Sequence, residues 1–374
     1  MRVVTVVGAR PQFIKVSPLA RALDERGVDH LIVHTGQHYD AAMSDDLFEE
    51  FALPQPWRHL GVGSAPAPIQ VGEMLVRLSP VLEEAQPDVV IVPGDTNSTL
   101  AGALAAAQLG LPVAHVEAGL RSFRRDMPEE RNRVLTDHLA HVLYAPSQRS
   151  VDWLAAEGIQ HGVVLAGDVM RDVLAWQLGR EDSGGLDRLG LEPGGYVLAT
   201  VHRPRNADDR ERREAIVRGL GAIAETWPVV LPVHPRTRRN LAELPRGVRA
   251  IDPLGHRDVV ELAASARAVV TDSGGLQKEA YWLGVPCVTL RAETEWVETV
   301  EQGWNTLVDA DERAIVAAVT RPASGTDDRD AYGTLGAADR IVDDLMARFS
   351  APPRGRLRSP DPDPPPRGKG AWAG

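Results

Sequence analysis

The sequence predicts an α/β protein built from two Rossmann-like, doubly wound domains. Short runs of Val, Ile and Leu alternate with longer amphipathic segments, and continuous apolar runs are typical of parallel strands buried on both faces. The alternation begins again in the second half of the chain, and a length of 374 residues suits two domains better than one. We therefore expect a cleft between the domains, where the carboxyl ends of both sets of strands face each other.

The elements of the first domain follow from this alternation. The expected strands are residues 3–7, 31–34, 89–92, 113–116 and 142–144. The expected helices between them include residues 12–25, 71–84 and 96–109. We place the first domain at residues 1–170, because the segment 179–185 (GREDSGG) that follows has the composition of a surface loop.

The second domain, expected at residues 171–349, repeats the pattern. Its expected strands are residues 196–200, 229–233, 248–251, 268–271 and 285–290. Its expected helices include residues 210–226, 257–266 and 276–283. Residues 350–374 are rich in Pro and polar residues, which predicts a disordered tail.

Composition narrows the class of function. The formal net charge is −11, which argues against nucleic acid or an anionic membrane as a partner. No apolar stretch approaches membrane-spanning length, and the first apolar run suits a strand better than a signal peptide. The single cysteine, Cys287, is expected as a small core residue in a reducing compartment. These features favour a cytoplasmic enzyme.

In the first domain, charged residues gather where the strands end. Residues 8–15 (GARPQFIK) form a glycine turn at a helix start, with Arg10 and Lys15 nearby, and free backbone N–H groups there suit an anion. Asp95 and Glu117 follow the third and fourth strands, and Glu129 opens a helix. Each has a structural alternative: surface cations, a helix cap or a favourable helix dipole. Together they favour a functional cluster, since a carboxylate after a buried strand needs a cleft or a partner.

The second domain offers a candidate binding turn. His202 follows its first strand, and Ser273-Gly274-Gly275 follows its fourth strand and opens a helix. This small turn lets a diphosphate approach the backbone N–H groups. Glu279 lies one turn into the helix, where it could accept hydrogen bonds from ribose hydroxyls. A lone Ser-Gly-Gly is a weak signal, and a lone histidine is more often structural. Both become candidates for a binding site because they are expected at strand ends that face the other domain.

Together these segments resemble the non-hydrolysing UDP-N-acetylglucosamine 2-epimerase family. The resemblance covers roughly residues 1–348 and runs in order through residues 8–15, 35–38 (TGQH), 94–96 (GDT), 115–121 (HVEAGLR), 128–130 (PEE), 202–203 (HR), 272–279 (DSGGLQKE) and 283–286 (LGVP). It implies two Rossmann-like domains in the GT-B arrangement. It also implies a UDP-sugar substrate, no cofactor and no metal, and we expect a homodimer.

The resemblance implies a mechanism and roles. UDP leaves by elimination across C1–C2, giving 2-acetamidoglucal, and then adds back after the C2 proton returns to the other face. By matching positions, Asp95, Glu117 and Glu129 form the acid/base set. The remaining matches are assigned to the sugar, the phosphates and the ribose: Arg10, Lys15 and His202 near the sugar and phosphates, Ser273, Gly274 and Gly275 at the diphosphate, and Glu279 at the ribose.

Some motifs depart from the commonest family pattern. Residues 8–15 and 294–298 (TEWVE) are more similar to the branch acting on UDP-2,3-diacetamido-2,3-dideoxyglucuronate, and Arg205 would suit an acidic sugar. Two other reaction classes stay open: a GT-B glycosyltransferase, which would need an acceptor site in the first domain, and a hydrolysing epimerase. Conversion of the nucleotide sugar alone would separate an epimerase from a transferase.

The resemblance also implies a second nucleotide-sugar site that activates many bacterial members. The chain keeps Gln37, His38, Arg203 and His234 of that site, but Arg205 stands where the family has glutamate. Guanidinium only donates hydrogen bonds, whereas glutamate accepts them. We therefore expect weak or absent activation by UDP-N-acetylglucosamine.

Overall fold

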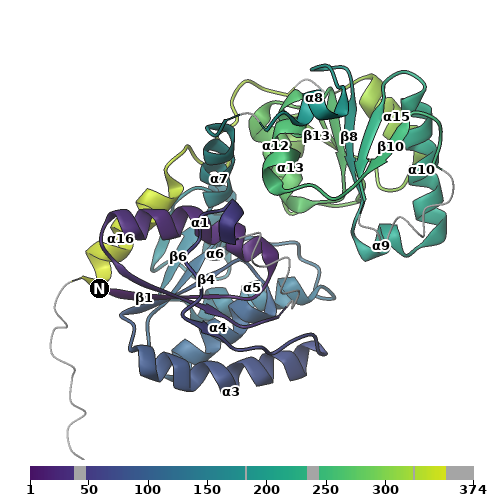
Figure 1. Cartoon of the computed structure of the whole chain (residues 1–374). Coiled ribbons are helices and arrows are strands. Elements are labelled where there is room, and N and C mark those ends of the chain that lie inside the picture. Colours follow the sequence, from purple (N-terminus) through teal and green to yellow (C-terminus); the bar gives the residue numbers. More distant parts are fainter. Residues whose placement is uncertain (38–47, 182, 234–243, 323–324, 351–374) are drawn as a thin grey trace, which may run out of the picture.

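The computed structural model describes residues 1–37, 48–181, 183–233, 244–322 and 325–350. These residues form two parallel sheets, each covered by helices on both faces (Figure 1). The sheets have seven and six strands. The predicted α/β fold with two doubly wound domains is confirmed. Within the described residues, no helix is both long enough and apolar enough to cross a membrane.

The first sheet has the strand order β3-β2-β1-β4-β5-β6-β7. Its strands are β1 (Arg2–Val7), β2 (Asp29–His34), β3 (Arg58–His59), β4 (Val89–Pro93), β5 (Val113–Val116), β6 (Val142–Ala145) and β7 (Val163–Leu165). Its helices are α1 (Arg10–Glu25), α3 (Ala67–Ala85), α4 (Asn97–Gln108), α5 (Pro128–Leu139), α6 (Gln148–Ala156) and α7 (Val169–Leu178). The order reverses direction between β1 and β4, which is the topological switch point where ligands bind in such sheets.

The two faces of this sheet are covered by different helices. Val4 and Val6 of β1 pack with the buried side chains of α3 and α4, whereas Val3 packs with α1 on the opposite face. This alternation follows from the two-residue period of a strand. Met74 and Leu78 of α3 are fully buried, so truncating either to alanine should cost about 2–5 kcal/mol of stability.

The second sheet has the strand order β10-β9-β8-β11-β12-β13. Its strands are β8 (Val197–Thr200), β9 (Val229–Pro232), β10 (Val248–Ile251), β11 (Ala268–Thr271), β12 (Cys287–Thr289) and β13 (Asn305–Leu307). Its helices are α8 (Gly185–Leu189), α9 (Pro204–Ala207), α10 (Arg210–Ala224), α12 (His256–Ser265), α13 (Gly274–Leu283), α14 (Val297–Glu301) and α15 (Glu312–Thr320). Its switch point lies between β8 and β11. Cys287 is buried in β12, and burial raises the pKa of its thiol to about 12, as expected for a core residue.

The last described helix, α16 (Ala337–Phe349), returns to the first domain. Ile341 and Leu345 are fully buried in the same apolar cluster as Val3 of β1 and Leu19 of α1, and Figure 1 shows α16 beside α1, far from the second sheet. We therefore count α16 with the first domain, although its sequence position lies in the range expected for the second. The boundary near residue 170 stays a prediction, and residues 351–374 of the expected tail lie outside those described.

An aromatic cluster joins the two domains. Phe13 of α1 and Phe51 belong to one buried cluster with Tyr281 and Trp282 of α13. The ring of Tyr332 contacts three of the aromatic rings around it edge-on, at centroid distances of 5.6 to 6.2 Å. Such edge-to-face contacts add about 0.5–1.5 kcal/mol each beyond the area they bury. The packing brings the two switch points to opposite sides of one cleft.

Candidate active site

One cavity of about 590 Å³ lies between the two switch points and is lined by residues from both domains. Nine of the ten predicted site residues line it: Arg10, Lys15, Asp95, Glu117, His202, Ser273, Gly274, Gly275 and Glu279. These side chains come from strand ends and helix starts that are far apart in the sequence. Their convergence in one hollow of ligand size is the arrangement expected for a small-molecule site.

The glycine turn before α13 has the geometry of an anion site. Ser273 caps the helix, and its hydroxyl accepts a hydrogen bond from the backbone N–H of Leu276. Among the described residues, no group accepts a hydrogen bond from the backbone N–H of Gly274 or Gly275. A Cβ atom at Gly274 would lie 2.9 Å from Oε1 of Glu295. Free N–H groups at the positive end of a helix dipole favour a diphosphate.

The glycine turn before α1 differs from this expectation. The backbone N–H groups of Gly8 and Ala9 both donate to Oε1 of Gln12, at 2.9 and 3.1 Å. They are therefore not free for an anion, and the predicted backbone cradle at residues 8–15 is wrong for these two groups. The glycine is needed for packing instead, since a Cβ atom at Gly8 would lie 2.0 Å from Oγ1 of Thr35. Arg10 and Lys15 still line the cavity.

Glu117 follows β5 and is held by two lysines. Its φ of +71° is the left-handed conformation that costs energy for a residue with a Cβ atom. Lys15 Nζ contacts Oε2, and Lys278 Nζ lies 3.2 Å from Oε1. Burial alone would raise the pKa of this carboxyl, but the two ammonium groups outweigh it and hold the pKa at about 2. Glu117 is therefore a buried, ionised group facing the cavity.

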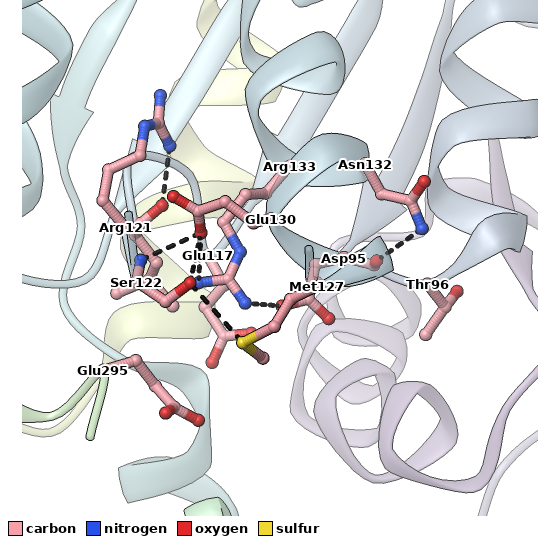
Figure 2. A network of polar contacts seen from close by, with 12 residues as sticks. Asp95, Thr96, Glu117, Arg121, Ser122, Met127, Glu130, Asn132, Arg133 and Glu295 are labelled. Atoms are coloured by element: carbon pink, nitrogen blue, oxygen red, sulfur yellow. Dashed lines mark hydrogen bonds and ion pairs between the residues drawn. The ribbon is translucent and has the colours of Figure 1, made fainter. Parts of the chain in front are cut away.

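Asp95 follows β4 and is tied to helix α5. Its carboxylate forms an ion pair with Arg133, and its backbone carbonyl accepts a hydrogen bond from Asn132 at 3.0 Å (Figure 2). The Asp95 side chain is 26% exposed, whereas that of Arg133 is 6% exposed. A buried guanidinium thus orients a carboxylate that remains accessible from the cavity. Arg133 also lies within electrostatic range of Glu117.

Glu129 lies apart from the other predicted residues. It is exposed at the start of α5 and lines an adjoining cavity of about 510 Å³, which Lys15 and Asp95 also line. Its neighbour Glu130 is buried and accepts hydrogen bonds from the backbone N–H groups of residues 122 and 123, at 2.9 and 2.8 Å. Glu130 therefore fixes the loop before α5, and Glu129 is the carboxylate left available for a ligand.

His202 and Glu279 are placed by partners within the second domain. The side chain of His202 is 61% exposed, and its Nδ1 lies 3.1 Å from Oδ1 of buried Asp272. Asp272 also accepts the backbone N–H groups of His202 and Arg203. Glu279 is 4% exposed and binds Nε2 of His256 at 2.7 Å. Burial opposes protonation of His256, but Glu279 outweighs it and the pKa of this histidine lies above its usual value.

A family model described as UDP-N-acetylglucosamine 2-epimerase matches residues 21–346. The chain belongs to the UDP-N-acetylglucosamine 2-epimerase family. Its members act as isomerases on UDP-sugars. The predicted family and the GT-B arrangement of the two domains are confirmed.

Three relatives of this epimerase family are particularly similar. A Methanococcus maripaludis UDP-N-acetylglucosamine 2-epimerase homolog is 45% identical over 87% of this chain and 94% of its own. The Pseudomonas aeruginosa UDP-2,3-diacetamido-2,3-dideoxy-D-glucuronate 2-epimerase is 43% identical over 92% and 99%. The Methanocaldococcus jannaschii UDP-GlcNAc 2-epimerase, solved with UDP-GlcNAc and UDP, is 38% identical with a TM-score of 0.83, covering 93% and 100%.

Four polar residues of this epimerase's cavity region were missed from the sequence: Arg133, Asp168, Lys278 and Glu295. Lys278 lies inside the segment 272–279, and Arg133 follows the segment 128–130 by three residues on the same helix, so their nearness to the predicted residues was the available signal. Asp168 caps α7, and Glu295 bonds Arg291 at 2.8 Å. No spacing in the sequence reveals that Asp168 and Lys278 meet across the two domains.

Residues of the expected second nucleotide-sugar site are only partly described. Gln37 lines the adjoining cavity beside Glu129, whereas His38 and His234 lie outside the described residues. Arg203 and Arg205 line a third cavity of about 190 Å³. Five arginines line this third cavity: Arg124, Arg203, Arg205, Arg212 and Arg291.

Proposed function

We propose that this protein is a non-hydrolysing epimerase that interconverts UDP-N-acetylglucosamine and its C2-inverted isomer. The observation that carries the proposal is the shared cavity, in which Asp95 and Glu117 face the free N–H groups of Gly274 and Gly275. One wall therefore offers carboxylates, and the other offers an anion site. The relatives whose names specify this activity support the same conclusion.

The reaction needs both walls at once. A base removes the C2 proton while the C1–oxygen bond to UDP breaks, which leaves a C1–C2 double bond and free UDP. Addition reverses the sequence: the UDP oxygen bonds to C1 and a proton is delivered to the opposite face of C2. No oxidant or reductant is consumed. Acid/base groups and a stabilised leaving group contribute most when they act in the same transition state.

The residues divide between these tasks. Asp95, Glu117 and Glu129 are the candidates for moving the C2 proton, because carboxylates on both sides of the sugar are required to invert it. Lys15 and Arg10 supply positive charge on the carboxylate side of the cavity. The turn at residues 273–275 would hold the diphosphate through backbone N–H groups, with His202 beside it. Glu279 would accept hydrogen bonds from the ribose.

Incubation with UDP-N-acetylglucosamine alone tests the proposal. We expect an equilibrium mixture with the C2-inverted sugar, separated by anion-exchange chromatography, in the absence of any acceptor. A glycosyltransferase would leave the donor intact, and a hydrolysing epimerase would release stoichiometric UDP and free sugar. Either result would overturn the assignment.

A second substrate, UDP-2,3-diacetamido-2,3-dideoxyglucuronate, is favoured by the third cavity. Arg203 lines both this cavity and the main one. Nη1 of Arg291 is buried and has no hydrogen-bond partner among the described residues. Arg205 lies within electrostatic reach of Asp309, a carboxylate whose main partner is Arg212. The Arg205 guanidinium and the Nη1 of Arg291, which bonds Glu295 through its other nitrogen, offer charge-assisted hydrogen bonds that suit a carboxylate.

The two substrates are distinguished by kcat/KM measured for each sugar with the wild type and with Arg205→Ala. If the acidic sugar is the substrate, the substitution lowers kcat/KM for that sugar by roughly tenfold, since one charge-assisted contact is worth about 1.5–3 kcal/mol, and leaves the other unchanged. An equal change in kcat/KM for both sugars would show that Arg205 does not determine substrate specificity.

We further propose self-association into a homodimer through the outer face of α3. Ile69 and Val76 on this helix are 59% and 74% exposed, and they lie two turns apart on one side. Exposed apolar stripes of this kind mark association surfaces. Light scattering should give twice the mass of the chain for the wild type and a monomer for Val76→Glu; a monomeric wild type would contradict this.

A further inference from the structure

Lys278 occupies a buried position between the two domains. It lies on α13, one turn beyond the glycine turn, and it is 1% exposed. Its Nζ contacts Oδ2 of Asp168 and lies 3.2 Å from Oε1 of Glu117. Both carboxylates belong to segments of the first domain. The ammonium group therefore joins the candidate nucleotide side of the cavity to a candidate acid/base residue on the other side.

The surroundings of Lys278 leave its Nζ little freedom. The Nζ lies 3.7 Å from the ring centroid of Trp296 and 5.7 Å from that of Trp282. A cation desolvated against an aromatic face is attracted by the negative face of the ring. Asp168 is itself fixed, because its other oxygen accepts the backbone N–H of Met170 at 2.9 Å. Lys278 is thus a rigid donor.

The two lysines that hold Glu117 are not equivalent. Lys15 contacts the opposite oxygen, its side chain is 16% exposed, and it lines two cavities. The side chains of Lys278 and Asp168 are each 1% exposed. The two lysines, Glu117 and Asp168 together carry two positive and two negative charges. Buried charges are tolerated when they are paired in this way.

We propose that Lys278 is a positioning residue, which reaches across the cleft to keep Glu117 ionised and correctly oriented for the reaction. This inference rests on the proposed epimerase function and deepens it. Because the contact joins two domains, the state of Glu117 depends on their closure. Without Lys278, burial would act against Lys15 and the more distant Arg133 guanidinium, and Glu117 would protonate at higher pH.

Two variants test this role. Lys278→Met removes the ammonium at similar length, but it leaves Asp168 buried and unpaired. The double variant Lys278→Met with Asp168→Asn removes one charge of each sign, so the remaining Lys15–Glu117 pair stays balanced. The matched control is Arg149→Gln, which removes two other ion pairs between the domains, to Glu298 at 3.4 Å and to Glu301 at 2.5 Å; none of these three residues lines the main cavity. Circular dichroism establishes that each variant is folded.

The readouts are kcat, the dissociation constant of UDP and the pH profile of kcat. We expect the double variant to lose roughly 100-fold in kcat, the scale of a small misplacement of a reacting group, with UDP binding within about twofold. The acidic limb of its pH profile should move to higher pH, because the ammonium that is removed contacts Glu117 at 3.2 Å whereas the removed Asp168 carboxylate is not among the main groups acting on Glu117. Arg149→Gln should leave kcat and the acidic limb of the pH profile unchanged.

Three results would overturn the inference. An unshifted acidic limb would show that Lys278 does not act on the ionisation of Glu117. A large loss of UDP affinity at unchanged kcat would assign it to binding. Failure of the charge-balanced double variant to fold would assign it to the core. The proposed function is judged separately on the wild type, since an inactive wild type would contradict the epimerase and not the position of Lys278.

Discussion

The glycine turn before α1 and the glycine turn before α13 lie on opposite walls of one cavity, and only the second presents free backbone N–H groups. The first has its N–H groups occupied by Gln12, and its wall faces the cavity with charged side chains such as Lys15 and Asp95. The second faces the cavity with Ser273 and two glycines. We propose that one wall serves proton transfer and that the other holds an anion.

This difference has a physical basis. Carboxylates that exchange protons need tuned surroundings, which buried partners such as Arg133 and Lys278 provide. A diphosphate needs several donors in a small space, and backbone N–H groups at a helix start supply these without bulky side chains. Two glycine turns with similar sequences can therefore have different functions. The difference depends on whether a nearby side chain already accepts hydrogen bonds from their backbone N–H groups.

The largest effects are expected from the carboxylate wall. Asp95→Asn, Glu117→Gln and Glu129→Gln should each lower kcat by at least ~100-fold, the usual scale for an acid/base group, with UDP affinity retained. The measurement is initial rate together with UDP titration by calorimetry. Retention of most activity in all three variants would contradict the acid/base assignment. Retention in Glu129→Gln alone would limit the acid/base role to Asp95 and Glu117, which line the main cavity.

A matched pair of substitutions sharpens the comparison between the turns. Among the described residues, the nearest atom to a Cβ added at Gly275 is Oγ of Ser273 at 3.9 Å. Gly275→Ala should therefore lower UDP affinity by about tenfold, or 1.4 kcal/mol, at unchanged stability. Gly8→Ala places a Cβ atom 2.0 Å from Oγ1 of Thr35, so it should lower stability by about 1–3 kcal/mol. The measurements are UDP calorimetry and thermal unfolding. The reverse pattern would contradict the account.

A smaller effect concerns the Glu279–His256 pair behind the anion wall. The pKa of His256 is raised in the folded protein by Glu279, so the stabilisation is fully present below the unfolded value near 6.5 and is lost as pH rises through the folded value. His256→Gln should therefore reduce thermal stability more at pH 6 than at pH 9. An equal reduction at both pH values would show that the pair contributes no proton-linked stability.

The fold was largely predictable, because ten of its strands coincide with apolar runs in the sequence. The short strands β3, β7 and β13 were missed, since two or three residues at or near a sheet edge carry no usable pattern. The return of α16 to the first domain was also missed, because a helix's amphipathic face does not reveal which sheet it covers.

The sequence predicted which positions form the candidate site, but it did not predict the ion pairs and hydrogen bonds between them. Strand exits pointed to Asp95, Glu117 and the turn at residues 273–275, which the structure brings together. The contacts that set their charge state involve Lys278 and Asp168, which are 110 residues apart. Pairings at that separation depend on how two domains pack, and no local pattern encodes them.

The smallest effect is expected outside both walls. Ending the chain at Phe349 should leave kcat and the melting temperature nearly unchanged, because a segment rich in Pro and polar residues is expected to bury little surface. Comparison of the shortened and full chains by differential scanning calorimetry and initial rate checks this. A large loss of stability would show that the tail packs on the folded protein.

In the proposed reaction, UDP departs and returns while the C2 proton is exchanged with solvent. A proton NMR time course with UDP-N-acetylglucosamine in D2O follows both events. We expect deuterium at C2 of the recovered epimer, with traces of UDP and 2-acetamidoglucal after long incubation. Epimer formed with no deuterium at C2 would indicate hydride transfer and would contradict elimination.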